Sequence, residues 1–266
     1  MSMALERTTL VAAVAGFGVA LLLDVLLRGQ DKRTWPAVSS ALSIVLALLT
    51  AAVAGRWLRE AQGPFLTLYD VLLSNLFSLT LVYLVAAWLV PALRGSSAIV
   101  VGFLGVLGVW CLTESAVAVP LPATFDNPWL WLHVTAGKVF LGLCLPAAAT
   151  ALLLLVRSAR ATSNNGEMDA AVWLTLSLAF VCHSFMLIAG AIWAHSAWGR
   201  YWAWDSLETW TFITWLCIAL LLHARVTFRR MPASYGWSAV VAIFGLAILT
   251  FLGVPFLSVA PHKGVM

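Results

Sequence analysis

Eight stretches of this chain are apolar for long enough to cross a lipid bilayer. A helix that crosses the hydrocarbon core needs about 20 mostly apolar residues. Cutting the sequence at its clusters of charge, proline and glycine leaves pieces of about that length at 8–27, 37–55, 68–92, 97–112, 129–156, 171–193, 208–226 and 238–259. Backbone polar groups in lipid must find their hydrogen bonds within their own segment. We therefore predict an all-α, polytopic transmembrane helical bundle of about eight spans.

The composition excludes several other classes of protein. The chain has 266 residues, of which 62% are hydrophobic and 10% are charged, which rules out a soluble globular fold and a disordered chain. Four cysteines are too few for a disulfide scaffold, and each lies in or beside an apolar stretch, so we expect packing roles. The net charge of +4 comes from short, scattered basic clusters, which suit lipid headgroups rather than nucleic acid. We expect residues 1–266 to form a single integral membrane domain.

The basic residues predict the orientation of the spans. Basic side chains accumulate in cytoplasmic loops close to span ends. With the amino terminus outside, nine of the fifteen fall on the cytoplasmic side, namely Arg28, Lys32, Arg33, Arg94, Arg157, Arg160, Arg225, Arg229 and Arg230. The loop between the last two spans then faces the cytoplasm. Residues 193–207, which we call the tryptophan-rich segment, would lie outside it.

Tryptophan is concentrated around this segment. Six of the fourteen tryptophans fall within 193–215, and Asp205 and Glu208 directly follow the fourth of them, Trp204. In a helix, Trp198, Tyr201, Trp202 and Asp205 would share one face, and such a helix would lie in the plane of the membrane surface. An aromatic belt at headgroup level is one interpretation. A platform for a flat aromatic ligand, with acidic groups at its polar edge, is the other.

The histidines could supply ligands to a metal held by such a platform. His133 begins the fifth span and His262 follows the eighth, so both can flank the tryptophan-rich segment at one depth, and two neutral imidazoles are a common axial pair for haem iron. His223 lies toward the cytoplasmic side of the seventh span. His183 lies about 15 Å below the outer surface, given the rise of a helix, and could share a ligand with His223 or make a packing hydrogen bond. We expect His195 to be solvated or to tune the segment.

The motif WGRYWAWDSLE at 198–208 resembles the signature WGxxWxWDxxE of the CcsA/ResC family of cytochrome c biogenesis proteins, which is related to CcmC and CcmF. Trp198, Gly199, Trp202, Trp204, Asp205 and Glu208 match the pattern in full. The surroundings of His133, His223 and His262 also resemble their counterparts in the family. The resemblance covers most of 129–262, which it identifies as a CcsA-like haem-handling core.

The resemblance implies a function in moving haem b. His133 and His262 would be the outer iron ligands and His223 an intramembrane ligand. Trp198, Trp202, Trp204 and Asp205, with Glu208, would present the haem, and His183 is a further candidate. A CcsB/ResB-like membrane partner would complete the inner site. The chain would thus be the haem-transporting part of a system II cytochrome c synthase in a plasma or thylakoid-type membrane, attaching haem to the CxxCH motifs of apocytochrome c.

Two alternative functions belong to different classes. One is a regulator or scaffold like the HemX group, which stabilises another enzyme without attaching haem. The other is a b-type electron-transfer subunit that uses paired histidines. The absorption spectrum of the purified protein separates them, because a scaffold would be colourless and an electron-transfer subunit would carry redox-active haem.

Overall fold

Helices build every regular element in the described part of the chain. The structure, a computed structural model, describes residues 2–28, 30–61, 63, 66–158, 166–228 and 231–254, and within these ranges it contains no β-strand. Eight of its helical segments are long and apolar enough to cross a membrane. The all-α, multi-pass architecture predicted from the sequence is confirmed.

The chain divides into two compact units, residues 1–120 and residues 121–264. Unit 1 contains α1 (Met3–Leu26), α2 (Asp31–Glu60), α3 (Leu68–Leu89), the 3-10 helix η1 (Pro91–Ser96) and α4 (Ser97–Thr113). Unit 2 contains the 3-10 helix η2 (Ala123–Phe125), α5 (Pro128–Ser158), α6 (Gly166–Trp198), α7 (Ser206–Thr227), α8 (Ala233–Ile248) and the π-helical turn η3 (Leu249–Gly253). The predicted core, 129–262, falls within unit 2.

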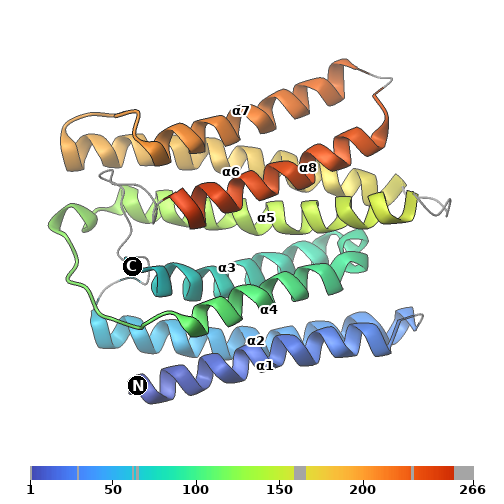
Figure 1. The fold of residues 1–266 in the computed structure, drawn as a ribbon, viewed down its shortest axis with the longest axis horizontal. Helices are drawn as coiled ribbons and strands as arrows, with labels where there is room; N and C mark the ends of the chain where they lie inside the picture. The colour runs from blue at the N-terminus through green and yellow to red at the C-terminus, as the bar shows by residue number, and fades with distance from the viewer. Residues whose placement is uncertain are drawn as a thin grey trace. The chain divides into compact units, whose positions relative to one another are not determined.

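Both units are four-helix bundles whose neighbours follow chain order. In unit 1, α1 packs on α2, α2 on α3, α3 on α4, and α4 back on α1. In unit 2, α5, α6, α7 and α8 form the same kind of closed ring, and their succession is visible in Figure 1. Short connections between antiparallel neighbours produce this arrangement. As a result, the starts of α5 and α7 lie at the same end of unit 2 as the ends of α6 and α8.

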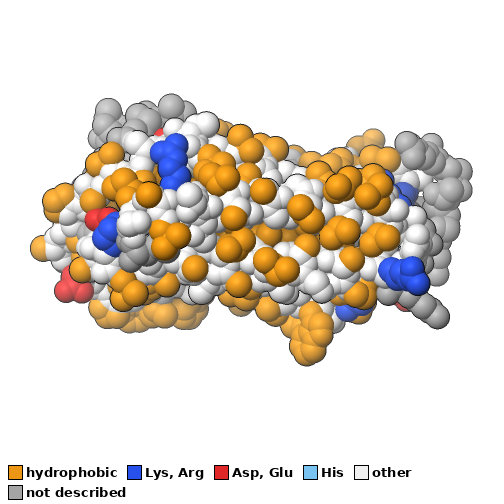
Figure 2. Space-filling view, turned by 90° about the horizontal axis from the view of Figure 1, so that it is seen from below, with side chains coloured by type: hydrophobic (Ala, Val, Ile, Leu, Met, Phe, Trp, Pro, Cys, Tyr) orange, Lys and Arg blue, Asp and Glu red, His pale blue; other side chains and the backbone are white. Residues whose placement is uncertain are grey.

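The fourth span is longer than the sequence predicted. The apolar run at 97–112 is short for a bilayer, but η1 leads directly into α4, and together they give a span of 23 residues, Pro91–Thr113. Proline stands at the first position of η1, where its missing N–H costs nothing. The face of the molecule in Figure 2 is covered mainly by hydrophobic side chains, with Lys and Arg toward its two ends, as expected for a surface in lipid.

Unit 1 contains a buried cluster of charges at one end. Arg56 of α2 pairs with Asp70 of α3, and its guanidinium lies 3.8 Å from the carboxylate of Glu6 in α1. Arg59 makes a closer ion pair with Glu6, at 2.6 Å, and Tyr69 donates a hydrogen bond of 2.9 Å to the same carboxylate. Arg59 also pairs with Glu60 of its own helix at 2.9 Å, so each of the two arginines lies between two carboxylates. The cluster joins the three helices through charge-assisted hydrogen bonds.

The opposite end of α1 carries a second polar contact. Asp24 pairs with Arg28 one turn later, at 3.7 Å, and also accepts a hydrogen bond from Ser97 of α4. The carboxylate of Asp24 therefore has a partner of opposite charge within its own helix. The cysteines are free thiols, with Cys111 and Cys144 buried, so the prediction of packing roles also holds for these two.

Candidate functional site

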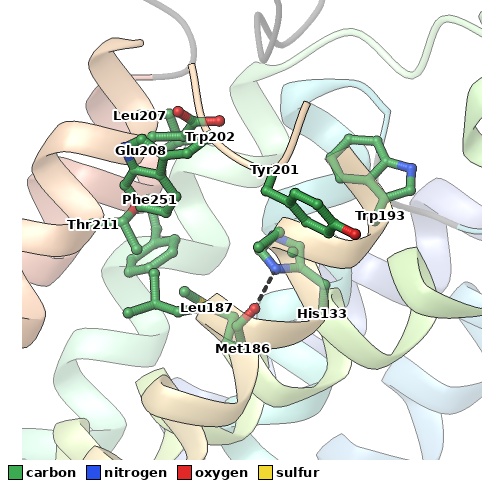
Figure 3. A pocket seen from close by; sticks show the side chains of 12 residues that line it. His133, Met186, Leu187, Trp193, Tyr201, Trp202, Leu207, Glu208, Thr211 and Phe251 are labelled. Atoms are coloured by element: carbon green, nitrogen blue, oxygen red, sulfur yellow. Dashed lines mark hydrogen bonds between the residues drawn. The ribbon is translucent and has the colours of Figure 1, made fainter. Parts of the chain in front are cut away.

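A pocket opens at the end of unit 2 where α5 and α7 begin and where α6 and η3 end. Its empty volume, which includes open solvent, is about 520 Å³. The lining is mostly apolar and aromatic, with one imidazole and one carboxylate, and comprises His133, Met186, Leu187, Gly190, Ala191, Trp193, Tyr201, Trp202, Leu207, Glu208, Thr211 and Phe251 (Figure 3). Residues from all four helical segments of the bundle therefore meet here.

The imidazole of His133 is held in a defined orientation. Its Nδ1 lies 2.9 Å from the carbonyl oxygen of Met186 on α6 (Figure 3). A carbonyl only accepts, so Nδ1 must carry the proton, and in the neutral ring the lone pair is then on Nε2. The ring also stacks on Trp193 at 6.2 Å. A backbone carbonyl that fixes the tautomer in this way is the usual support of a metal-binding histidine.

The close approach of His133 to α6 depends on a glycine. A Cβ atom added at Gly190 would lie 2.5 Å from Nδ1 of His133. On α5, one helical turn after His133, a Cβ atom added at Gly137 would lie 2.9 Å from the sulfur of Met186. Two glycines, one on each helix, thus let α5 and α6 pack closely enough for the hydrogen bond to form.

The tryptophan-rich segment is irregular between α6 and α7, which corrects the expectation of a helix there. Helix α6 ends at Trp198 and α7 begins at Ser206. Gly199 and Trp204 have φ angles of +74° and +57°, and two left-handed residues so close together end a right-handed helix. The side chains of Trp198, Tyr201, Trp202 and Asp205 therefore do not share one helical face.

Trp202 is the tryptophan of the motif that lines the pocket. Its indole Nε1 is buried and has no hydrogen-bond partner among the described residues. Trp204 packs edge-on against it at 5.8 Å but is itself 69% exposed. Trp198 packs edge-on against Trp193 at 4.9 Å. Trp202 therefore forms part of the pocket wall, Trp198 packs against Trp193, and Trp204 is exposed.

The two acidic residues of the motif organise the backbone. The side chain of Asp205 is the N-cap of α7 and accepts a hydrogen bond of 2.8 Å from the amide of Glu208. The carboxylate of Glu208 accepts in turn from the amide of Ala203, at 2.7 Å. These contacts satisfy donors at the start of α7 and close the turn that presents Trp202. Of the two side chains, Glu208 also reaches the pocket wall.

His183 and His223 do not line the pocket. His183 is fully buried on α6, where it stacks on Phe140 at 4.1 Å and meets Phe251 edge-on at 6.2 Å. His223 is exposed near the far end of α7, and its Nε2 lies 3.3 Å from the hydroxyl of Thr227. The structure gives no shared site for the two. His195 is exposed and stacks on Tyr201 at 4.2 Å, while His262 lies outside the described residues.

The sequence did not single out several residues of this site. Met186 and Gly190 carry no motif, and only the packing of α5 on α6 shows that they position His133. Phe251 comes from a span that was recognised by its hydropathy alone. Trp193 was counted in the tryptophan cluster, which was the available signal. Within the described ranges, no three His, Cys, Asp or Glu side chains come together as a metal-binding group, so a metal here would have few protein ligands.

Comparisons with known proteins cover nearly the whole chain. A family model described as "Cytochrome C assembly protein" matches residues 3–262. "Cytochrome c biogenesis protein CcsA" of Prochlorococcus marinus is 28% identical over 275 residues, covering 85% of this chain and 84% of the relative. The protein of that name from Nicotiana tomentosiformis is 25% identical, covering 94% and 92%, and that from Chlamydomonas reinhardtii is 28% identical, covering 92% and 71%. With its eight apolar helices and the tryptophan motif at its pocket, the chain belongs to the CcsA family of cytochrome c assembly proteins.

Proposed function

We propose that this chain holds haem at the pocket of unit 2 and presents it for attachment to apocytochrome c. The observation that carries the proposal is the imidazole of His133, whose Nδ1 is bound by the carbonyl of Met186. That contact leaves the lone pair on Nε2, the nitrogen through which a neutral histidine binds iron. The family membership supports it, since the relatives are named for cytochrome c biogenesis.

The remaining residues of the pocket fit a flat, largely apolar molecule with acidic edges. Trp193 and Trp202 offer aromatic surfaces, and Tyr201 and Phe251 add two more rings. The buried indole N–H of Trp202, which has no partner among the described residues, is a donor that suits a carboxylate such as a haem propionate. We assign the presentation of haem to Trp202, supported by Trp198, Trp204, Asp205 and Glu208.

Further ligands are proposed from the family pattern. His262 would be the second outer ligand, and His223 would bind haem on its way through the membrane, together with a CcsB/ResB-like partner. His223 is exposed on α7, as a residue shared with another subunit would be. We also propose that the tryptophan-rich segment lies outside the cytoplasm, in a plasma or thylakoid-type membrane.

The chemistry attributed to the complex is thioether formation. Each thiol of a CxxCH motif adds across one vinyl group of the haem, so that a carbon–sulfur bond forms and the thiol proton goes to the neighbouring vinyl carbon. The nucleophiles belong to the apocytochrome. This chain contributes orientation, because it fixes the haem while the thiols approach, and such positioning accelerates a two-molecule reaction.

The test compares two histidines at the same end of α5 and α6. We expect His133→Ala to lower the haem content of the detergent-purified protein at least about tenfold, since an iron ligand is removed. His195→Ala is the matched control, because His195 lies outside the pocket lining, and it should keep the wild-type content. Haem is measured by absorption after extraction. A colourless wild-type protein, or equal haem in wild type and His133→Ala, would contradict the proposal.

A further inference from the structure

The hydrogen bond from His133 to Met186 fixes one atom of the imidazole but not the plane of the ring. Hydrogen bonds to a carbonyl oxygen are formed over a broad range of directions. The ring could therefore tilt about Nδ1 while the distance of 2.9 Å to the carbonyl is kept. The lone pair of Nε2 lies in the ring plane, so a tilt turns it away from a bound iron. A second contact is needed to define the direction of the ligand.

The indole of Trp193 supplies this second contact. Its ring stacks on the imidazole of His133, with centroids 6.2 Å apart and planes inclined by 24°, and the two side chains lie next to one another in Figure 3. Offset, nearly parallel rings at such a distance form a favourable aromatic pair. A tilt of the imidazole would break the stacking. Trp193 and Met186 both belong to α6, so one helix sets the position of the ring and also its plane.

Trp193 is itself held firmly. The residue is only 3% exposed, and its Nε1 donates a hydrogen bond of 2.9 Å to the carbonyl of Thr124 in η2. Two more rings pack edge-on against the indole, Phe125 of η2 at 5.4 Å and Trp198 at 4.9 Å. Because the indole is fixed at its N–H and against two rings, it cannot follow a movement of the imidazole.

The connection between η2 and α5 is fixed at the same place. The side chain of Asn127 accepts a hydrogen bond of 2.9 Å from the amide of Trp129, in the first turn of α5. Its amide group donates a bond of 2.8 Å to the hydroxyl of Ser196, near the end of α6. The helix that carries His133 is therefore tied to the helix that carries Trp193 close to both rings.

We propose that Trp193 is a positioning residue, which sets the plane of the His133 imidazole by stacking and so directs Nε2 toward the iron. The proposal rests on the function proposed above, because it concerns how the same ligand holds the same haem. It assigns a specific function to a tryptophan outside the motif at 198–208, and it couples the iron ligand to the backbone of η2.

The experiment measures the dissociation constant for haemin by absorption titration of the detergent-purified protein. Trp193→Leu removes the flat ring and should weaken binding about two- to tenfold, the range that an aromatic pair contributes. In a His133→Ala background the same substitution should change the constant by less than about twofold, because the residue through which Trp193 acts is then gone. Trp210→Leu is the control. Trp210 is a half-exposed tryptophan of α7 outside the pocket lining, and this variant should bind as the wild type does.

A spectroscopic measurement reports on the plane of the ligand directly. The electron paramagnetic resonance spectrum of ferric haem depends on how the plane of an axial imidazole is oriented. Trp193→Leu should therefore shift and broaden the signals. Trp193→Phe is the milder variant, because it keeps a flat ring and loses only the N–H that binds Thr124. It should bind haemin more tightly than Trp193→Leu and broaden the signals less, and it carries the test if the leucine variant does not fold.

The outcomes separate this inference from the proposed function. If the wild type binds no haemin, or His133→Ala binds it equally well, the proposed function is overturned and this inference with it. If His133→Ala binds weakly but the Trp193 variants match the wild type in affinity and spectrum, only this inference is overturned. An equal loss with Trp193→Leu in both backgrounds also overturns it, since Trp193 would then act without His133.

Discussion

Gly190 is the residue that sets the position of His133. A Cβ there would lie 2.5 Å from the imidazole nitrogen, a separation that real Cβ atoms do not tolerate, and the neighbour is a ring rather than a flexible chain end. The hydrogen bond of His133 to Met186 therefore exists only while position 190 has no side chain. The ligand and its support are separated by 53 positions in the chain, so the sequence showed the histidine but not the glycine.

We expect Gly190→Ala to weaken haem retention about 10- to 100-fold, because the displaced imidazole loses its supporting carbonyl. Overpacking should also lower stability by about 1–3 kcal/mol. Gly245→Ala is the control, since nothing lies within 4 Å of a Cβ at that helical position. Haem content and thermal unfolding in detergent measure the two effects. Equal retention in both variants would show that Gly190 does not position the ligand.

At the scale of elements, the spans were predictable and the turn between α6 and α7 was not. Hydropathy located all eight helices because lipid requires long apolar segments, but it made several of them too short: 37–55 was predicted where α2 runs from Asp31 to Glu60, and η1 extends the fourth span. The spacing of Trp198, Tyr201 and Trp202 fits a helix, yet the left-handed backbone at Gly199 and Trp204 interrupts it. The spacing of side chains does not indicate that the backbone of Trp204 has a positive φ angle, so the sequence could not predict this turn.

The motif aspartate, Asp205, offers a test of what the turn requires. If its function is to cap α7, Asp205→Asn should be tolerated, because asparagine caps as well as aspartate does, and Asp205→Ala should cost about 0.5–2 kcal/mol. The alanine variant should also retain less haem, since the turn that carries Trp202 loosens. Thermal unfolding and haem content are measured for both. Equal losses in the two variants would instead assign the function to the negative charge.

At the scale of the whole molecule, the charge cluster of unit 1 could not be predicted from the sequence. Asp70 belongs to α3, its partner Arg56 comes from another helix, and Glu6 comes from a third. Pairing over such separations depends on how the bundle closes. The boundary between the units, at residues 120 and 121, was also not predicted, because the sequence indicated a single domain for residues 1–266.

We expect Asp70→Asn to destabilise the protein by about 3–5 kcal/mol, because it leaves the guanidinium of Arg56 buried with too little negative charge. Combining it with Arg56→Met should recover part of this loss, since the guanidinium that lost its partner at position 70 is then removed as well. Thermal unfolding in detergent compares the single and double variants. A double variant less stable than Asp70→Asn would show that Arg56 contributes chiefly in another way.

The guanidinium of Arg56 also holds the segment of unit 1 that follows α4. It donates hydrogen bonds of 3.4 and 3.1 Å to the carbonyls of Ala116 and Val117, just before the chain leaves unit 1. The segment that follows α4 is therefore held to α2 at these two residues. Substituting Arg56 would remove these hydrogen bonds and free the segment. A spin label placed in this segment should then report faster local motion than in the wild type.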